Sequence, residues 1–134
     1  MKVVLDINIF VSSFFWGGNP RKIMERIIDG KDKLFTCKEI LQETATVMLR
    51  PKFKVTNEYI THFIRSIEDI ANQISLTGEI QNVCRDSDDD KILECALLAD
   101  AEYIISGDDD LLVLGEFRGI KIVTAKEYLE KPNL

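Results

Sequence analysis

The stretch Val3-Val4-Leu5-Asp6, near the start of a chain of 134 residues, decides the fold. Three apolar residues, two of them β-branched, follow one another with no polar residue between them. This lack of alternation is typical of a strand that is buried on both faces of a parallel sheet. We therefore expect residues 3–5 to form the first, central strand, with Asp6 at its carboxyl end.

Strands and helices alternate along the rest of the chain. Short apolar runs predict strands at residues 33–36, 74–76, 103–105 and 120–123, and apolar residues at helical spacing predict helices at residues 20–30, 38–50, 58–73 and 87–98. We expect Asn19 to cap the first of these helices, residues 108–114 to form a helical turn, and Thr124 with Glu127 to form a capping box for a last helix. This order predicts a single α/β domain, residues 1–134, with three α/β/α layers around a mainly parallel central sheet.

The composition limits the class of protein. A net charge of -6 argues against a protein that coats nucleic acid through bulk positive charge. The cysteines Cys37, Cys84 and Cys95 are odd in number and form no C-x-x-C pair, which predicts free thiols in a reducing, cytoplasmic compartment. Because Asp6 interrupts the first apolar run, we expect neither a signal peptide nor a membrane span.

Residues 84–91, with the sequence CRDSDDDK, carry four carboxylates within five positions. Two interpretations stand: the acids splay into solvent at the start of a helix capped by Ser87, or they converge on a cation. The positions of the other acidic residues favour the second interpretation, convergence on a cation. Asp6 and Asp108 each follow a predicted strand, and Glu43 lies one turn into a helix that follows another strand. Four acids from separated segments are therefore expected to meet at the carboxyl edge of the sheet.

The residue types at this edge indicate the chemistry. Carboxylates without histidine or cysteine suit magnesium or manganese and not zinc. The lone histidine, His62, lies in a predicted helix and is expected at the surface. Without a histidine base, a metal-activated water is the economical nucleophile for phosphodiester cleavage. Glu94 lies one helical turn after Asp90, and it is either an outer ligand or turned to solvent.

Five motifs in order resemble a PIN-domain nuclease of the group that forms the toxin component of toxin–antitoxin systems, the VapC-like toxins. The resemblance covers nearly the whole chain and lies in VVLDIN at residues 3–8, EILQE at 39–43, RPKF at 50–53, CRDSDDDK at 84–91 and SGDDDLL at 106–112. It implies a PIN-like α/β/α fold and an endoribonuclease that depends on Mg²⁺ or Mn²⁺. It also implies a protein antitoxin as a partner.

The resemblance further implies roles for single residues. The acidic quartet of the family matches Asp6, Glu43, Asp90 and Asp108, as catalytic and metal-binding residues. Asp6 and Asp90 are then the primary ligands, while Glu43 and Asp108 complete the pocket and help to activate the nucleophile.

Other residues have supporting roles by the same resemblance. Asn8 is expected to orient Asp6 by a hydrogen bond, and Ser106 to contact an acid or a bound water. Asp89 and Asp110 are the alternatives if the register differs by one or two positions. One position departs from the family, which usually has Asp-Thr-Asn at the first motif: Ile7 here replaces a hydroxyl, which would lower metal affinity or turnover if that hydroxyl holds a carboxylate.

An acidic protein needs a local basic rim to bind RNA. The candidate contacts are Arg21, Lys22 and Arg85, although ordinary surface charge explains each of them equally well. The aromatic residues 14–16 are candidates to stack on bases, but we favour a contact with a homodimer partner or an antitoxin, or a place in the core.

Two other functions remain open at this point. A catalytically weak PIN module that binds RNA or protein is motivated by Ile7. An acid-cluster phosphatase on a similar sheet is disfavoured, because phosphatases with an aspartate nucleophile need Asp-x-Asp and this chain has Asn8 at the second position.

Overall fold

The computed structural model describes residues 1–131 of the chain, and this part contains one six-stranded sheet. The strand order is β3-β2-β1-β4-β6-β5. The strands are β1 (Lys2–Leu5), β2 (Lys33–Thr36), β3 (Ala71–Gln73), β4 (Tyr103–Ile105), β5 (Glu116–Phe117) and β6 (Ile120–Val123). All neighbouring strands are parallel except β5 and β6. The first strand is central, as predicted, and its residues 3–5 are fully buried.

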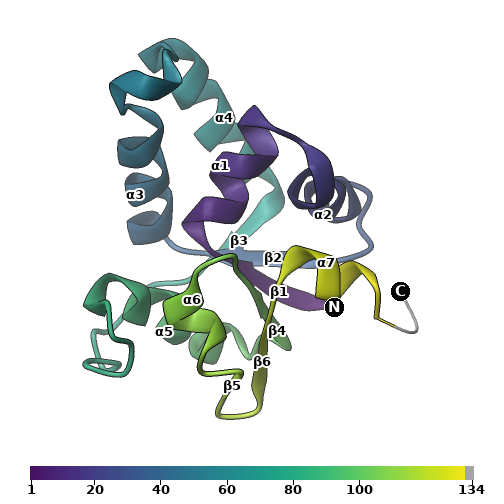
Figure 1. Cartoon of the computed structure of the whole chain (residues 1–134), viewed down its shortest axis with the longest axis vertical. Coiled ribbons are helices and arrows are strands. Elements are labelled where there is room, and N and C mark those ends of the chain that lie inside the picture. The colour runs from purple at the N-terminus through teal and green to yellow at the C-terminus, as the bar shows by residue number, and fades with distance from the viewer. Residues whose placement is uncertain (132–134) are drawn as a thin grey trace.

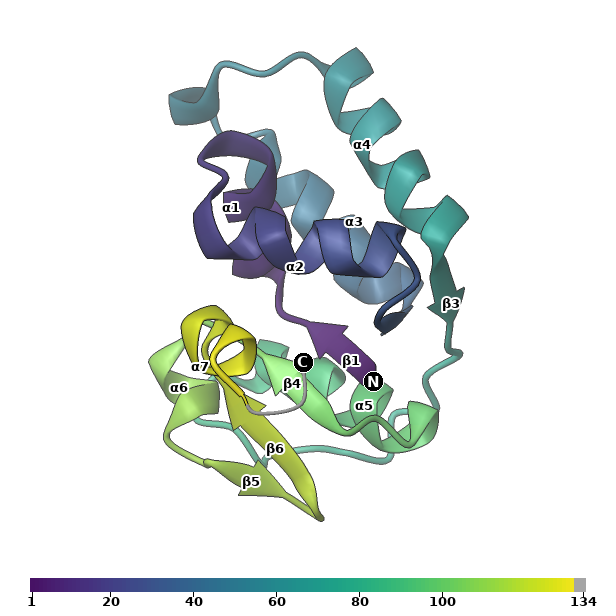
Figure 2. The same cartoon turned by 90° about the vertical axis from the view of Figure 1, so that its right-hand side faces the viewer.

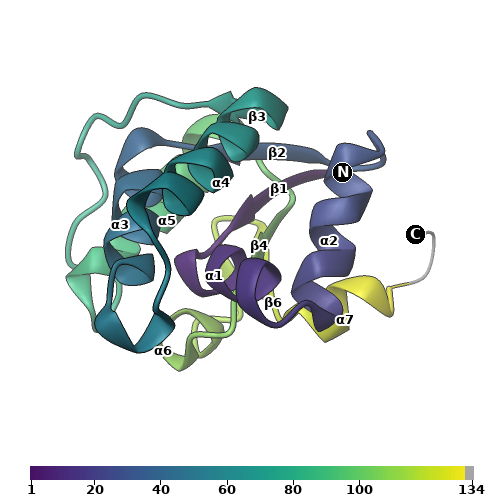
Figure 3. The same ribbon diagram turned by 90° about the horizontal axis from the view of Figure 1, so that it is seen from above.

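Helices cover both faces of this sheet. They are α1 (Ile7–Phe15), α2 (Gly18–Ile28), α3 (Lys38–Met48), α4 (Asn57–Ile70), α5 (Asp90–Ala99), α6 (Asp109–Leu112) and α7 (Ala125–Leu129), with short 3-10 helices η1 (Pro51–Phe53) and η2 (Ser87–Asp89). Helices α1 to α4 lie on one side of the sheet and α5 on the other (Figures 1 and 2). Viewed from above, α3 and α4 run side by side (Figure 3). The α/β/α layers predicted from the sequence are therefore confirmed.

The contacts of α5 explain why seven of its ten residues are apolar. It packs against β1, β2 and β4, and Ile92, Leu93, Cys95 and Ala96 are fully buried there. All three cysteines are free, as the sequence predicted, and all three are also buried. None of the helices within residues 1–131 combines the length and the apolar character needed to cross a membrane.

The predicted strand at residues 74–76 is wrong. The chain leaves α4 at Ile70 and pairs at once with β2, so that β3 occupies residues 71–73. Beyond it, the Ile74 N–H donates to the Thr36 carbonyl at 2.8 Å. The backbone of β2, and not the apolar residues at 74 and 76, therefore sets the position of this edge strand.

Two further details at the N-terminal end differ from expectation. Residues 7–15, for which the sequence predicted no element, form α1. The predicted cap Asn19 lies inside the first turn of α2, because the helix begins at Gly18 with Gly17 as its cap. Gly17 has a φ of 73°, a conformation that glycine adopts at little cost. The predicted capping box is confirmed, since Thr124 and Glu127 exchange hydrogen bonds of 3.0 and 3.1 Å.

The pairing of β1 with β4 positions the first two residues of the candidate site. Leu5 lies opposite Ile105 in this parallel pair, so Asp6 and Ser106 emerge next to each other at the carboxyl edge. The Asp6 N–H donates to the Ile105 carbonyl at 3.0 Å, which extends the pairing by one residue.

Candidate active site

Asp6 is a buried carboxylate with both oxygens held by the protein. Its Oδ1 accepts from the Ile7 backbone N–H at 2.6 Å, and its Oδ2 accepts from the Ser106 hydroxyl at 2.7 Å. Ser106 Oγ in turn accepts from the Asp108 backbone N–H at 2.9 Å. The side chain of residue 7 takes no part in these bonds, so the isoleucine leaves the carboxylate oriented. Ser106 is the link between the first and the last acid of the site.

Three further carboxylates converge beside Asp6. One oxygen from each of Asp89, Asp108 and Asp110 lies within 4.8 Å of the others. Asp108 is fixed because it caps α6, accepting from the Asp110 N–H at 2.9 Å. Asp89 is 7% exposed, and its Oδ2 is buried with no hydrogen-bond donor among residues 1–131. We call Asp6, Asp89, Asp108 and Asp110 the acidic cluster.

The protein compensates the negative charge of this cluster only in part, because Arg85 pairs with Asp110 and the other three carboxylates have no basic partner within residues 1–131. Burial raises the pKa of Asp89 to about 8, and the neighbouring Asp108 carboxylate, with Asp6, adds to the effect. Burial also raises the pKa of Asp6, against the hydrogen bonds from Ser106 and Ile7. Crowded carboxylates of this kind are stabilised by a proton or by a bound cation.

Asp90 lies on a different side of the same helical turn. Its Oδ1 accepts from the Cys84 backbone N–H at 2.8 Å, and its side chain lines a pocket between α5 and the preceding loop. Burial and the Asp90 carboxylate raise the pKa of the Cys84 thiol to about 12. Within the described chain the converging group of three acids contains Asp89 and not Asp90, so the metal-ligand role predicted for Asp90 stays a prediction.

The remaining predicted acids are paired with basic residues from the acid-rich segment. Glu43 forms an ion pair with Lys91, and Asp110 forms one with Arg85. Glu43 also lies close enough to raise the pKa of Asp6 by charge repulsion, after the larger effects of burial and hydrogen bonding. Residues 84–91 therefore bring two positive charges to the acidic edge.

Other predicted contacts are placed away from the cluster. Arg21 donates to the carbonyls of Ser13 and Phe14 at 3.1 and 3.2 Å and so caps the end of α1. Lys22 is exposed on α2. Asn8 is exposed, and no hydrogen bond joins it to Asp6 in the described residues. His62 is exposed on α4, as predicted.

The predicted cap Ser87 is wrong. The Asp86 carboxylate accepts from the Asp88 N–H at 3.0 Å and caps the 3-10 turn that precedes α5. An aspartate can cap a helix as well as a serine, and here the cap lies one residue earlier. This shift changes the direction in which each following aspartate points.

Glu94 has a role that the sequence did not reveal. It is 3% exposed, and its carboxylate accepts from the backbone N–H groups of Thr77, Gly78 and Ile80 at 2.6, 3.1 and 3.3 Å. Neither alternative taken from the sequence, an outer ligand or a solvent-facing acid, describes it. No local pattern signals this contact, because the partners lie 14 to 17 residues away.

The acidic cluster predicts an unusual pH dependence for the metal-free protein. Because the folded-state pKa of Asp89 is raised from 3.8 to about 8, the folded state binds a proton that the unfolded state loses. Stability is thus lost as the pH rises from 5 to 8, and we expect the Tm in EDTA to fall by about 5 °C. Thermal unfolding measures this. Asp89→Asn should flatten the dependence of Tm on pH, whereas Asp88→Asn, at an exposed position, should keep it. The same dependence in the native chain and both variants would contradict the raised pKa of Asp89.

Comparisons with known proteins identify the family and support the fold. A family model described as PIN domain matches residues 2–110. An uncharacterised protein of Methanocaldococcus jannaschii is 32% identical, and the alignment covers 98% of this chain and 91% of that protein. A chain in the crystal structure of VapBC2 from Rickettsia felis, bound to a DNA fragment from their promoter, has a similar fold, with a TM-score of 0.63. It is 12% identical, and the match covers 91% of this chain and 97% of that one.

Proposed function

The chain belongs to the PIN domain family, and we propose that it is a metal-dependent endoribonuclease that acts as the toxin of a toxin–antitoxin pair. The observation that carries the proposal is the acidic cluster at the carboxyl edge of the sheet. One oxygen from each of three carboxylates lies within 4.8 Å of the others, beside the buried Asp6. This is a donor set for a hard cation, and a bound cation can in turn hold a phosphodiester oxygen.

The residues present fit Mg²⁺ or Mn²⁺. The donors are all oxygens, and the buried Asp89 Oδ2 has no donor to satisfy it in the described chain. We assign Asp89, Asp108 and Asp110 as the ligands, with Asp6 beside them and Glu43 at the rim. When bound, such an ion supplies charge stabilisation to a phosphate oxygen and lowers the pKa of water.

Hydrogen bonds and ion pairs within the chain orient the acidic residues in the absence of substrate. Ser106 orients Asp6 and fixes the backbone of Asp108 in one contact network. Lys91 and Arg85 bring positive charge to the rim through their pairs with Glu43 and Asp110. Arg85, whose side chain is 74% exposed, can also attract the phosphates of an RNA strand to this acidic edge.

A partner surface supports the antitoxin part of the proposal. Trp16 is 68% exposed and Leu49 51% exposed. The Trp16 ring packs against Phe15 and Phe53, with ring centroids 5.6 and 6.0 Å apart. A contiguous exposed apolar group such as Trp16 with Phe15 and Phe53 is typical of a protein contact. Together with the resemblance to VapC-like toxins and the fold shared with a chain of VapBC2, this favours an antitoxin over stacked bases, with a second copy of the chain as the other occupant. The three reduced cysteines support a cytoplasmic location.

The experiment that tests the function is RNA cleavage in the presence of Mn²⁺ or Mg²⁺. We compare the native chain with Asp6→Asn and Asp108→Asn, and use Asp109→Asn as the matched control. Asp109 is exposed and adjacent to Asp108, so it gives the same change of charge outside the cluster. Loss of cleavage in the first two variants and its retention in the third supports the enzyme.

Other outcomes would assign a different function. Equal cleavage by all four proteins would show a contaminating nuclease. RNA binding without cleavage would favour the catalytically weak module, and release of phosphate from small monoesters would favour the phosphatase.

Ser106 gives a further prediction about the site. Ser106→Ala removes the hydroxyl that binds Asp6 and the acceptor for the Asp108 N–H, so we expect metal affinity to fall by about 10-fold to 100-fold. Calorimetric titration with Mn²⁺ measures this without any substrate. Ser106→Thr keeps the hydroxyl and should restore affinity, and an unchanged affinity in the alanine variant would remove Ser106 from the site.

A further inference from the structure

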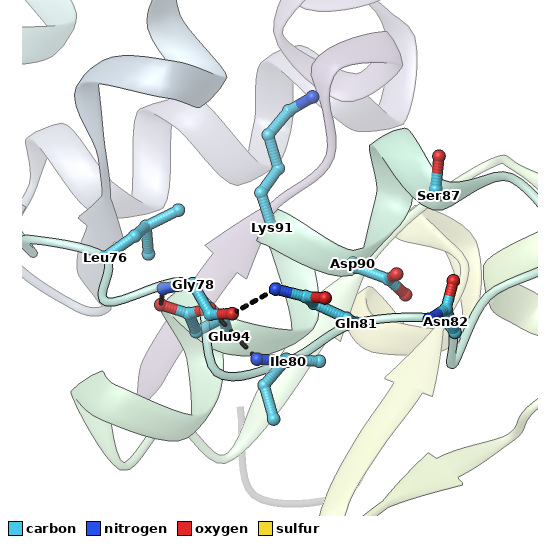
Figure 4. Close-up of a pocket in the computed structure, with 9 residues that line it drawn as sticks. All are labelled: Leu76, Gly78, Ile80, Gln81, Asn82, Ser87, Asp90, Lys91 and Glu94. Atoms are coloured by element: carbon cyan, nitrogen blue, oxygen red, sulfur yellow. Dashed lines mark hydrogen bonds between the residues drawn. The ribbon is translucent and has the colours of Figure 1, made fainter.

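We infer that the pocket next to the acidic cluster is a subsite for one nucleobase of the bound RNA, and that it favours bases with an exocyclic amino group. The inference rests on the proposed function, because it places an RNA strand at the cluster. The pocket has a volume of about 360 Å³ and lies between the loop of residues 76–82 and the first turns of α5 (Figure 4). This volume is within the usual range of small-ligand sites.

The pocket and the cluster are joined through consecutive residues of one helical turn. Asp89 belongs to the cluster, and Asp90 and Lys91, which follow it, line the pocket. Lys91 also reaches back to pair with Glu43. In this inference, a strand whose phosphodiester lies at the cluster places its neighbouring nucleotide at the mouth of this pocket.

The charge of the lining excludes a phosphate as the occupant. The charged side chains are Asp90, Lys91 and Glu94. The positive charge of Lys91 is offset by Glu43, and the Glu94 carboxylate is turned to the backbone N–H groups of the loop. The pocket is thus net negative, and it suits a neutral ligand that offers N–H donors.

The polar groups that remain for such a ligand are mainly acceptors. Asp90 is 5% exposed, its carboxylate points toward Asn82 in Figure 4, and it accepts one backbone N–H of the roughly four bonds that a carboxylate can accept. Gln81 Nε2 donates to the Gly78 carbonyl at 2.9 Å, which leaves the Gln81 amide oxygen for other partners. Ser87 lies at the same mouth.

The base class follows from these acceptors. Adenine, cytosine and guanine carry an exocyclic amino group, whereas uracil has carbonyl oxygens at the corresponding edge. Carbonyl oxygens facing the Asp90 carboxylate would repel it. Side-chain reading of an unstacked base by its edge is the usual mode of sequence recognition in RNA.

The first experiment uses nucleosides, which bear no phosphate and need no cleavage. Adenosine, cytidine and uridine are titrated into the isotope-labelled chain, and the side-chain amide signals of Asn82 and Gln81 are followed by NMR. We expect adenosine and cytidine to bind with an affinity at least about fivefold higher than uridine. Asn82→Gly deletes the amide and tolerates the φ of 58° at this position, and it should lower adenosine affinity by about fivefold. Val83→Ala, in the same loop but outside the pocket, should leave it unchanged.

The outcomes separate this inference from the proposed function. Equal responses to the three nucleosides, or shifts confined to other residues, overturn the subsite even if RNA is cleaved. Base-dependent shifts at Asn82 and Gln81 support it even if no cleavage is found, in which case the nuclease proposal fails alone. Tighter binding of N-acetyl-arginine amide than of any nucleoside would overturn the inference and assign the pocket to a peptide.

Discussion

Asp89→Asn is expected to lower metal-dependent RNA cleavage by about a hundredfold or more, while Asp90→Asn, one residue further along, should cost less than about tenfold. The two carboxylates differ in what they contact. Asp89 faces Asp108 and Asp110 with a buried oxygen that has no donor in the described chain, so its charge is available to a cation. Asp90 accepts from the Cys84 N–H, and an asparagine oxygen can keep that bond.

Single-turnover cleavage in Mn²⁺ measures the loss of activity in each variant. Calorimetric titration of Mn²⁺ independently measures the loss of metal affinity. Asp88→Asn is the matched control, because Asp88 is exposed and carries the same charge in the same segment. A large loss in Asp90→Asn with a small one in Asp89→Asn would restore the assignment made from the sequence, with Asp90 as the primary ligand.

The sequence could not choose between these residues for a physical reason. Three consecutive aspartates occupy positions 88–90, and successive residues of a helix point about 100° apart. Which of these aspartates faces Asp108 therefore depends on the residue at which the helix begins. Ser87 was the expected cap, but the Asp86 carboxylate caps the turn and a 3-10 segment precedes α5. Serine and aspartate are both good capping residues, so the sequence alone does not decide at which of them the turn begins.

Other parts of the site were predictable in outline. The apolar runs that predict β1 and β4 place Asp6 and the residues after β4 at one edge of the sheet, since parallel strands end at the same edge. The pairing of β1 with β4, which brings Asp6 next to Ser106, comes from the structure. Contacts between a side chain and a distant backbone, such as those of Glu94 with the loop, were not predictable. The pairing of β3 with β2 right after α4 and the bond from the Cys84 N–H to Asp90 were not predictable either, because no local pattern signals them.

Glu94→Ala is expected to lower the free energy of unfolding by about 2 to 4 kcal/mol. The variant removes the acceptor of three backbone N–H groups in the loop that begins at Thr77. The Ile80 N–H is buried and loses its partner outright, whereas Thr77 and Gly78 are exposed enough for water to replace part of the loss. Urea denaturation measures the change in the free energy of unfolding. Hydrogen exchange should be faster at the Thr77, Gly78 and Ile80 amides than in the rest of the chain.

Acidification gives the same contact a second, independent test. Burial alone would raise the pKa of Glu94, but the hydrogen bonds from Thr77, Gly78 and Ile80 hold it below 4.5. Its stabilisation is therefore present above pH 4.5 and is lost as the pH falls through the folded-state value. The stability gap between the native chain and Glu94→Ala should narrow below about pH 4.

Glu79→Ala is the control for this test, because Glu79 is exposed in the same loop and makes no side-chain hydrogen bond within the described residues. A gap that stays constant with pH would mean that Glu94 contributes packing and not charge. If the gap narrows as expected, the carboxylate holds the loop that leads into the Cys84 N–H and the start of α5. The Glu94→Ala variant should then weaken Mn²⁺ binding although Glu94 contacts no member of the acidic cluster.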